Sequence, residues 1–199
     1  MKVVDILFAL ICGKAVAWLI LDFLKEYGID IGIYKWILSG FLPLFSLFCL
    51  WLAYLIGKKA LFVFEAAKFV LVGAIATIID LNLFELFNWG LSFFILEETA
   101  MASKGISFIM ATGAKYWGNK YWCFEKSAKE NPVKEGVKFF AVTLIGLALD
   151  MGFFFYFTKV LGPQFGTPSD VWIKFSVIFA ALGAAAWNFS GYKFLVFKK

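Results

Sequence analysis

The stretch KFVLVGAIATIID, residues 68–80, decides the fold, because it returns 70 positions later as KFFAVTLIGLALD, residues 138–150. Both copies open with Lys-Phe, continue through apolar and small residues, and end in an Asp. Twelve residues of helix span roughly 18 Å, so each Asp is expected beyond the middle of a bilayer core about 30 Å thick. The stretch therefore predicts a membrane-spanning helix with one intramembrane carboxylate, present twice.

The repeat continues beyond these two helices. Lys104 returns as Lys174 at the same offset of 70 residues, and KYWGNKYWCF, residues 115–124, aligns with NFSGYKFLVF, residues 188–197, after a slip of three. Each repeat, residues 65–126 and 135–199, is predicted to be a helical hairpin. Because each holds an even number of helices, the two hairpins are expected to run parallel, related by a pseudo-twofold axis along the membrane normal.

Composition places the chain in lipid. Of its 199 residues, 62% are hydrophobic and only 17% are charged, against roughly 45–50% and about 25% in soluble domains. Six segments approach the ~20 apolar residues that a membrane-spanning helix needs; they are 3–24, 36–56, 69–87, 104–117, 139–157 and 175–192. We predict an all-α polytopic bundle of six transmembrane helices: an N-terminal pair (1–64) and a duplicated four-helix domain (65–199).

The first segment has a second interpretation, as a secretory signal. It begins with a basic residue, and its sequence 15–17, Ala-Val-Ala, imitates a cleavage site. Asp5 and Lys14, however, interrupt the apolar run where a signal sequence is cleanest. We expect the segment to be retained as a helix; cleavage would leave five spans.

The distribution of Lys predicts the orientation. With six spans and both termini cytoplasmic, 13 Lys fall inside and 5 outside, which the positive-inside rule favours; Lys14 lies within the first span and is not counted. The inside group is Lys2, Lys58, Lys59, Lys68, Lys115, Lys120, Lys126, Lys129, Lys134, Lys138, Lys193, Lys198 and Lys199, and the outside group is Lys25, Lys35, Lys104, Lys159 and Lys174. Residues 118–137 are then the main cytoplasmic loop.

The residue types limit the chemistry. The chain has no His, all 19 basic residues are Lys, and its three Cys lie far apart. His is the commonest general base near neutral pH and a preferred ligand of catalytic zinc, and no nucleophile, phosphate-loop or metalloprotease motif is present. We expect no catalytic residue, no metal site and no cofactor. The net charge of +5 is explained by cytoplasmic Lys, so no nucleic-acid partner is expected.

The intramembrane carboxylates have candidate partners. Asp80 precedes Lys104 by 24 residues, and Asp150 precedes Lys174 by the same 24. A carboxylate inside the membrane is costly unless it is paired or faces water. Either the two pairs stabilise their hairpins, or they line a polar cavity that receives a head group.

The ordered motifs resemble a known family, the GtrA-like membrane proteins, whose domain also forms the membrane part of some polyprenol-phosphate mannose synthases. The resemblance covers about residues 65–199 and rests on three motifs, which are KFVLVG with Thr77 and Asp80, then NKYWCF at 119–124, and the second copy ending at Phe197. Lys115 and Tyr192 stand where the family usually has Asn. The resemblance implies a role in handling polyprenyl-phosphate-linked sugars for cell-surface polysaccharide or glycolipid synthesis, by translocation or by binding of the lipid carrier.

The hairpin ends are the candidate site for this lipid. Lys120 and Lys193 lie among aromatic residues, with Asn119 and Trp122 beside the first. They form either an ordinary aromatic belt with positive-inside anchoring or a site for a lipid phosphate. The predicted partner is polyprenyl phosphate or its glycosyl ester.

Two other functions stay open. A small proton-coupled exporter of the multidrug type would use an intramembrane carboxylate, and a non-catalytic membrane anchor would present residues 118–137 to a partner glycosyltransferase. Small-residue runs at 111–114 and 183–186 permit close helix contact, within one chain or in a homodimer. Because nearly all of the chain is membrane-embedded, no domain is left to bind a nucleotide sugar, so we expect a non-enzymatic protein of the plasma membrane.

Overall fold

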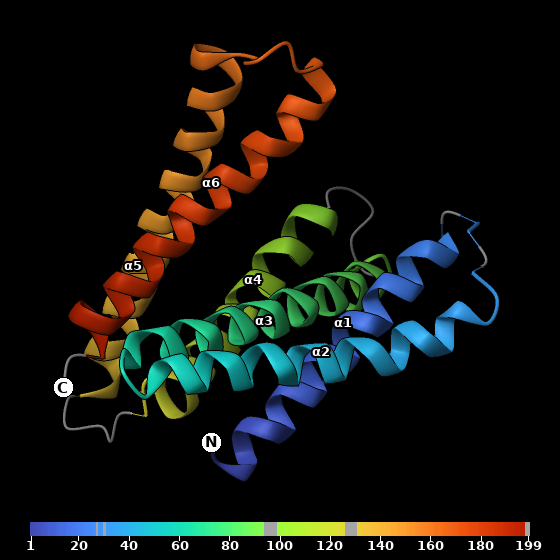
Figure 1. Ribbon diagram of the computed structural model, residues 1–199. Helices are drawn as coiled ribbons and strands as arrows, with labels where there is room; N and C mark the ends of the chain where they lie inside the picture. The colour runs from blue at the N-terminus through green and yellow to red at the C-terminus, as the bar shows by residue number, and fades with distance from the viewer. Residues whose placement is uncertain (27, 30, 94–98, 126–130, 198–199) are drawn as a thin grey trace. The chain divides into compact units, whose positions relative to one another are not determined.

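The computed structural model describes residues 1–26, 28–29, 31–93, 99–125 and 131–197, with backbone alone at 26, 99–101, 104, 170–171, 173–174 and 177. The chain forms two compact units, Met1–Glu125 and Lys126–Lys199 (Figure 1). This grouping differs from the division at residue 64, because the N-terminal helices pack on the first hairpin. The boundary at residue 64, drawn between the N-terminal pair and the duplicated four-helix domain, stays a prediction.

The first unit contains four α-helices. α3 contacts the other three, and α1 also packs along α2. The helices are α1 (Val3–Glu26), α2 (Tyr34–Gly57), α3 (Leu61–Leu91) and α4 (Thr99–Trp117), and α4 continues as the π-helix η1 (Gly118–Cys123).

The second unit is a single hairpin. Its elements are α5 (Pro132–Phe155) with the π-helix η2 (Tyr156–Leu161), and α6 (Ser169–Gly191) with the π-helix η3 (Tyr192–Val196). Asn131 caps α5, since its side-chain oxygen accepts the amide hydrogen of Val133 at 3.0 Å, and Pro132 occupies the first helical position, where no amide donor is needed.

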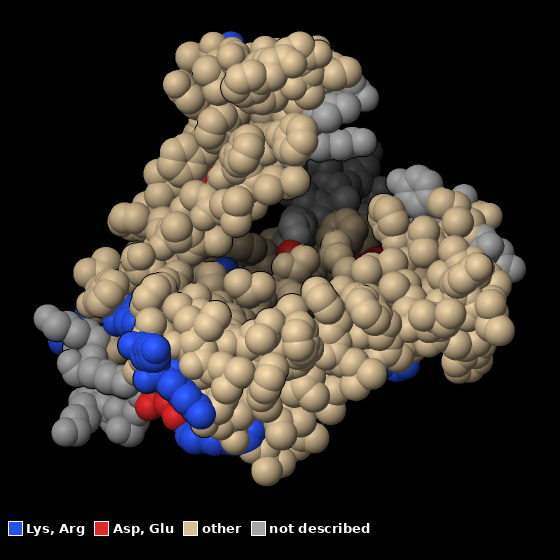
Figure 2. Space-filling model, viewed as in Figure 1, with Lys and Arg blue, Asp and Glu red and all other residues tan. Residues whose placement is uncertain are grey.

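The all-α fold with six helices is confirmed, and no strand occurs in the described ranges. Four helices are long and apolar enough to cross a bilayer, namely Val3–Lys25, Tyr34–Gly57, Leu61–Leu91 and Pro132–Leu161. The helices predicted at 104–117 and 175–192 are present as α4 and α6; that they cross the bilayer stays a prediction. On the face drawn in Figure 2, most of the surface is uncharged, and the charged side chains that can be seen gather mainly at one end, as expected where a charge within the bilayer is costly.

α3 is longer than predicted. It begins at Leu61 instead of 69 and has 31 residues, about 46 Å at 1.5 Å per residue. The charged residues Glu65 and Lys68 do not end the helix, because both are buried within the first unit. The apolar segment predicted at 69–87 lies entirely within this helix.

Candidate functional site

A buried ion pair lies at one end of the first unit. The Lys68 ammonium is 2.8 Å from Asp5 Oδ1, and each side chain is only 2% exposed. The same ammonium donates to the Trp122 carbonyl at 3.3 Å and to Glu125 Oε1 at 3.1 Å. An ammonium has three hydrogens, so these acceptors match its full donor capacity.

Asp5 is equally well satisfied. Its Oδ1 also accepts the indole N–H of Trp122 at 2.9 Å, and its Oδ2 accepts the Lys2 amide at 2.7 Å. The second bond is half of a capping box, in which the third helical residue binds the amide that precedes the helix. Trp122 stacks on Phe8 with ring centroids 4.5 Å apart. Asp5 therefore both caps α1 and attaches it to α3 and η1.

A second, exposed ion pair closes this cluster toward water. Lys2 Nζ lies 2.6 Å from Glu125 Oε2, with side chains 66% and 42% exposed. The hydrogen bond from Lys2 and the bond from Lys68 hold the pKa of Glu125 below its ordinary value, and the bond to Glu125 raises the pKa of Lys2. Glu125 has a φ of 46°, a left-handed conformation that is uncommon for a non-glycine residue.

This cluster was not foreseen from the sequence, although a signal for it exists. Asp5 lies near the start of the first apolar segment and Lys68 near the start of the third. With one span between them, both starts lie on the same side of the membrane. An acid and a base at similar depth in two odd-numbered spans are natural partners, because a buried charge needs a countercharge.

The predicted lipid-phosphate residues occupy equivalent places in the two hairpins. The Lys120 ammonium is 5.2 Å from the Tyr116 ring and 5.6 Å from the Tyr121 ring. The Lys193 ammonium is 5.7 Å and 5.8 Å from the rings of Phe189 and Phe194. Each hairpin thus ends with a Lys between two aromatic rings. One ring belongs to the residue four positions before the Lys, and the other to the residue directly after it.

The predicted residues differ in burial. Lys120 is 2% exposed, and Asn119 is fully buried, whereas Lys193 is half-buried. Lys120 also donates to the Tyr116 hydroxyl at 2.9 Å. Trp122 faces α1 through Phe8 and Asp5. A role for Asn119 or Trp122 in binding lipid stays a prediction.

The backbone at both sites departs from the α-helix in the same way. The Phe124 amide donates to the Asn119 carbonyl at 2.9 Å, and the Phe197 amide donates to the Tyr192 carbonyl at 2.7 Å, in each case five residues back. Such π turns are rare and are frequent at functional sites. No sequence pattern indicated them.

The intramembrane carboxylates are only partly described. Asp80 Oδ1 accepts the Ser107 hydroxyl at 2.6 Å, and Asp150 is half-buried in α5. The side chains of Lys104 and Lys174 lie outside the described residues, so the two predicted pairs stay predictions. Over the part of the chain that the structure describes, no group of three or more Cys, Asp and Glu could hold a metal ion.

Comparison with known proteins places the chain in a family. The model of the family described as GtrA/DPMS, transmembrane domain, matches residues 68–197. This range begins at the buried Lys68 and ends after η3, and it leaves α1 and α2 outside. No curated protein and no solved structure matched. The sequence resemblance is thus confirmed, and this membrane protein belongs to the GtrA/DPMS transmembrane domain family.

Proposed function

We propose that this membrane protein binds polyprenyl phosphate or its glycosyl ester and moves the lipid between leaflets, or holds it for a partner enzyme, in cell-surface polysaccharide or glycolipid synthesis. Membership of the GtrA/DPMS transmembrane family supports this proposal. It acts in the plasma membrane, with both termini in the cytoplasm.

One observation carries the proposal: a Lys between two aromatic rings ends each hairpin. Aromatic rings hold a helix end at head-group depth, and Lys binds phosphate as a point charge. A polyprenyl phosphate leaves its chain in hydrocarbon and brings its phosphate to this depth. One juxtamembrane Lys attracts an anionic lipid by only about 1 kcal/mol, so selective binding needs Lys120 and Lys193 together.

The proposal includes a duplication of the hairpin. A close helix contact at matching positions in the two units supports it. A Cβ atom added at Gly118 would contact Val72, and one added at Gly191 would contact Val142. Val72 and Val142 are 70 residues apart, and Gly118 and Gly191 are 73 residues apart. These separations are the two offsets of the sequence repeat.

We further propose that no covalent step takes place on this chain. Nothing in its sequence resembles a nucleotide-sugar domain, so a partner glycosyltransferase makes or consumes the lipid-linked sugar. Assembly as a homodimer, through the small-residue runs at 111–114 and 183–186, is part of the same proposal.

Transbilayer movement in reconstituted vesicles tests the function. The wild-type protein is expected to speed the appearance of a fluorescent polyprenyl-phosphate sugar in the opposite leaflet, several-fold over protein-free vesicles. Lys120→Gln with Lys193→Gln is expected to remove most of this gain. Lys25→Gln with Lys35→Gln, which alters two exposed Lys at the end of α1 and the start of α2, is the matched control.

An equal rate in wild-type and protein-free vesicles, together with no binding of the labelled lipid, would overturn the proposal. Proton-coupled efflux of a cationic dye that is lost in Asp80→Asn would favour the exporter instead. Reporter fusions after Lys129 and Lys199 are expected to be cytoplasmic, and one at Gln164 external.

A further inference from the structure

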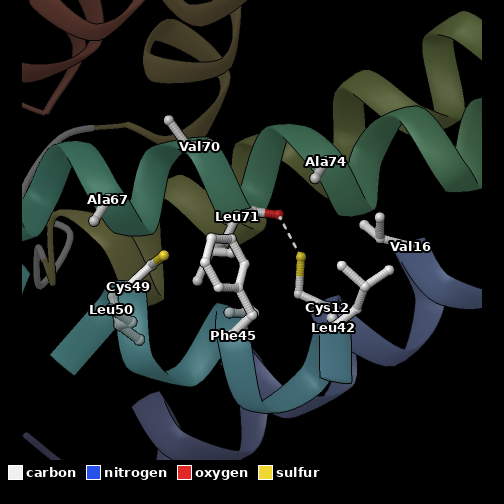
Figure 3. Close-up of a pocket in the computed structure, with 12 residues that line it drawn as sticks. Cys12, Val16, Leu42, Phe45, Cys49, Leu50, Ala67, Val70, Leu71 and Ala74 are labelled. Atoms are coloured by element: carbon white, nitrogen blue, oxygen red, sulfur yellow. Dashed lines mark hydrogen bonds between the residues drawn. The ribbon is translucent and has the colours of Figure 1, made fainter. Parts of the chain in front are cut away.

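A cavity of about 400 Å³ lies between α1, α2 and α3 of the first unit, a size typical of ligand sites. Figure 3 shows its lining: Phe45 and Cys49 project from α2 toward α3, and the Cys12 thiol approaches the Leu71 carbonyl, 3.7 Å away. No charged residue lines the cavity. Most of its wall comes from α1 and α2, outside the family match.

The cavity follows from short side chains at helical spacing on α3. Ala67 and Ala74 contribute to its wall and lie on one face of the helix, with Leu71 between them. On the other side, α1 and α2 touch backbone to backbone, since a Cβ at Gly13 would lie 2.5 Å from the Cα of Pro43. The close crossing and the short side chains leave a hollow that neighbouring side chains do not fill.

Its position makes a hydrocarbon chain the fitting occupant. The three helices are apolar enough to span a bilayer, and Val70, one of the lining residues, is 64% exposed. Apolar cavities exclude water but accept apolar ligands. A hollow of this kind at lipid depth therefore suits a hydrocarbon chain.

The turn between α2 and α3 supplies a site for a phosphate. Lys58 and Lys59 are exposed in this turn, and Figure 2 shows Lys side chains gathered there. Eight residues separate Lys59 from Ala67 on α3, roughly 12 Å of helix. The head-group layer begins within this distance of the hydrocarbon core, so one lipid can reach both sites.

We propose that this cavity binds one hydrocarbon chain of a phosphate-headed membrane lipid, with the phosphate at Lys58 and Lys59. The proposal gives the N-terminal helices a lipid site of their own. It does not depend on Lys120 and Lys193, and so it stands apart from the proposed function.

Photocrosslinking of the full-length protein in nanodiscs tests the site. The probe is phosphatidylglycerol with a diazirine in its acyl chain, and crosslinked residues are mapped by mass spectrometry. Crosslinks are expected to concentrate on lining residues such as Cys12, Phe45 and Cys49. Cys49→Trp, which fills the cavity, is expected to reduce them at least several-fold. Leu55→Trp, an exposed position on α2 outside the lining, is the matched control.

A separate experiment tests the phosphate site at Lys58 and Lys59. Lys58→Gln with Lys59→Gln is expected to lower the crosslinking several-fold, while Lys25→Gln with Lys35→Gln leaves it unchanged. Unlabelled phosphatidylglycerol and unlabelled polyprenyl phosphate are then added as competitors, and the stronger competitor identifies the natural source. Crosslinks spread evenly over all lipid-facing helices, or competition by neither lipid, would overturn the proposal. Loss of crosslinking in Lys120→Gln with Lys193→Gln would contradict its independence from the proposed function.

Discussion

The two hairpins have the same order of helices but differ in what surrounds them. The first consists of α3, α4 and η1, and the second of α5, α6 and η3. Each ends in a π-helix that carries a Lys between two aromatic rings. In the first, Lys68 is 2% exposed and bound to Asp5 of the N-terminal pair. Its counterpart in the second, Lys138, is exposed. Trp122 is 6% exposed, whereas its counterpart Leu195 is 58% exposed.

The difference shows what the N-terminal pair contributes. α1 supplies a carboxylate and a ring at the same place, and both partners on the first hairpin, Lys68 and Trp122, are buried by them. Lys68 and Trp122, both within the family match, thus attach the N-terminal helices to the first hairpin, and the order of helices in that hairpin stays the same as in the second. The function proposed for both hairpins depends on the Lys and aromatic rings that they share. The lipid cavity depends on α1 and α2, which pack on the first hairpin.

The largest effect is expected from breaking the buried pair. Asp5→Ala removes the buried countercharge of Lys68 and leaves its ammonium only the more exposed Glu125, 3.1 Å away. Loss of one partner of a buried pair typically costs about 3–5 kcal/mol, and the remaining contact with Glu125 places the expected cost toward the low end. Unfolding of the purified protein in mixed micelles, followed by circular dichroism, measures the loss. Lys138→Ala in the second hairpin serves as the control and is expected to change stability little.

A double-mutant cycle sharpens this result. Asp5→Ala with Lys68→Met is expected to be less destabilised than Asp5→Ala alone, because no buried charge is left unpaired. Additive losses in the double variant would show that the two residues do not stabilise each other.

The close helix crossings rank second. A Cβ at Gly191 would lie 2.5 Å from Val142 Cγ1, and one at Gly118 would lie 2.9 Å from Val72 Cγ1. Overpacking typically costs about 1–3 kcal/mol, so Gly191→Ala is expected to lower thermal stability more than Gly118→Ala. Val142→Ala added to Gly191→Ala is expected to recover part of the loss. The reverse ranking of the two glycines would contradict this packing.

The Asp80 carboxylate gives a smaller effect. Ser107→Ala removes a donor 2.6 Å from Asp80, and a hydrogen bond to a charged group contributes about 1.5–3 kcal/mol. Because Asp80 is only half-buried, the low end of that range is expected in denaturant titration. Ser92→Ala, an exposed hydroxyl, is the control. Equal stability of the two variants would show that Asp80 does not depend on this donor.

The exposed pair of Lys2 and Glu125 gives the smallest effect and a pH dependence. Because the pKa of Glu125 is lowered from 4.5 in the folded protein, its contribution is present above that value. It is lost as the pH falls through the lowered pKa. The stability difference between wild type and Glu125→Gln is therefore expected at pH 7 and absent in strong acid. Scanning calorimetry at several pH values measures it; a difference that persists in strong acid would contradict the assignment.

Much of the fold could be predicted because it depends on apolar length and on the repeat. The 70-residue offset located both hairpins, and the span at 36–56 matches α2 closely. α3 and α5 begin eight and seven residues before the predicted segments at 69–87 and 139–157, and these extensions carry the buried charged residues Glu65, Lys68 and Glu135. Hydropathy alone assigns such residues to water.

The site was harder to predict. Lys120 and Lys193 could be chosen because their aromatic neighbours are adjacent in sequence or one helical turn away. The pairing of Asp5 with Lys68 joins segments 63 residues apart and requires the order of spans as well as their depth. The π-helices have no sequence signature, since one extra residue per turn depends on packing around it.

Binding of the lipid tests the central claim most directly. Native mass spectrometry of the gently purified protein is expected to show a bound polyprenyl phosphate. The amount should fall at least several-fold in Lys120→Gln with Lys193→Gln and only mildly in either single variant, with circular dichroism unchanged. The control Lys25→Gln with Lys35→Gln should retain the lipid. Equal amounts of bound lipid in the wild type and in the folded double variant at Lys120 and Lys193 would contradict the account.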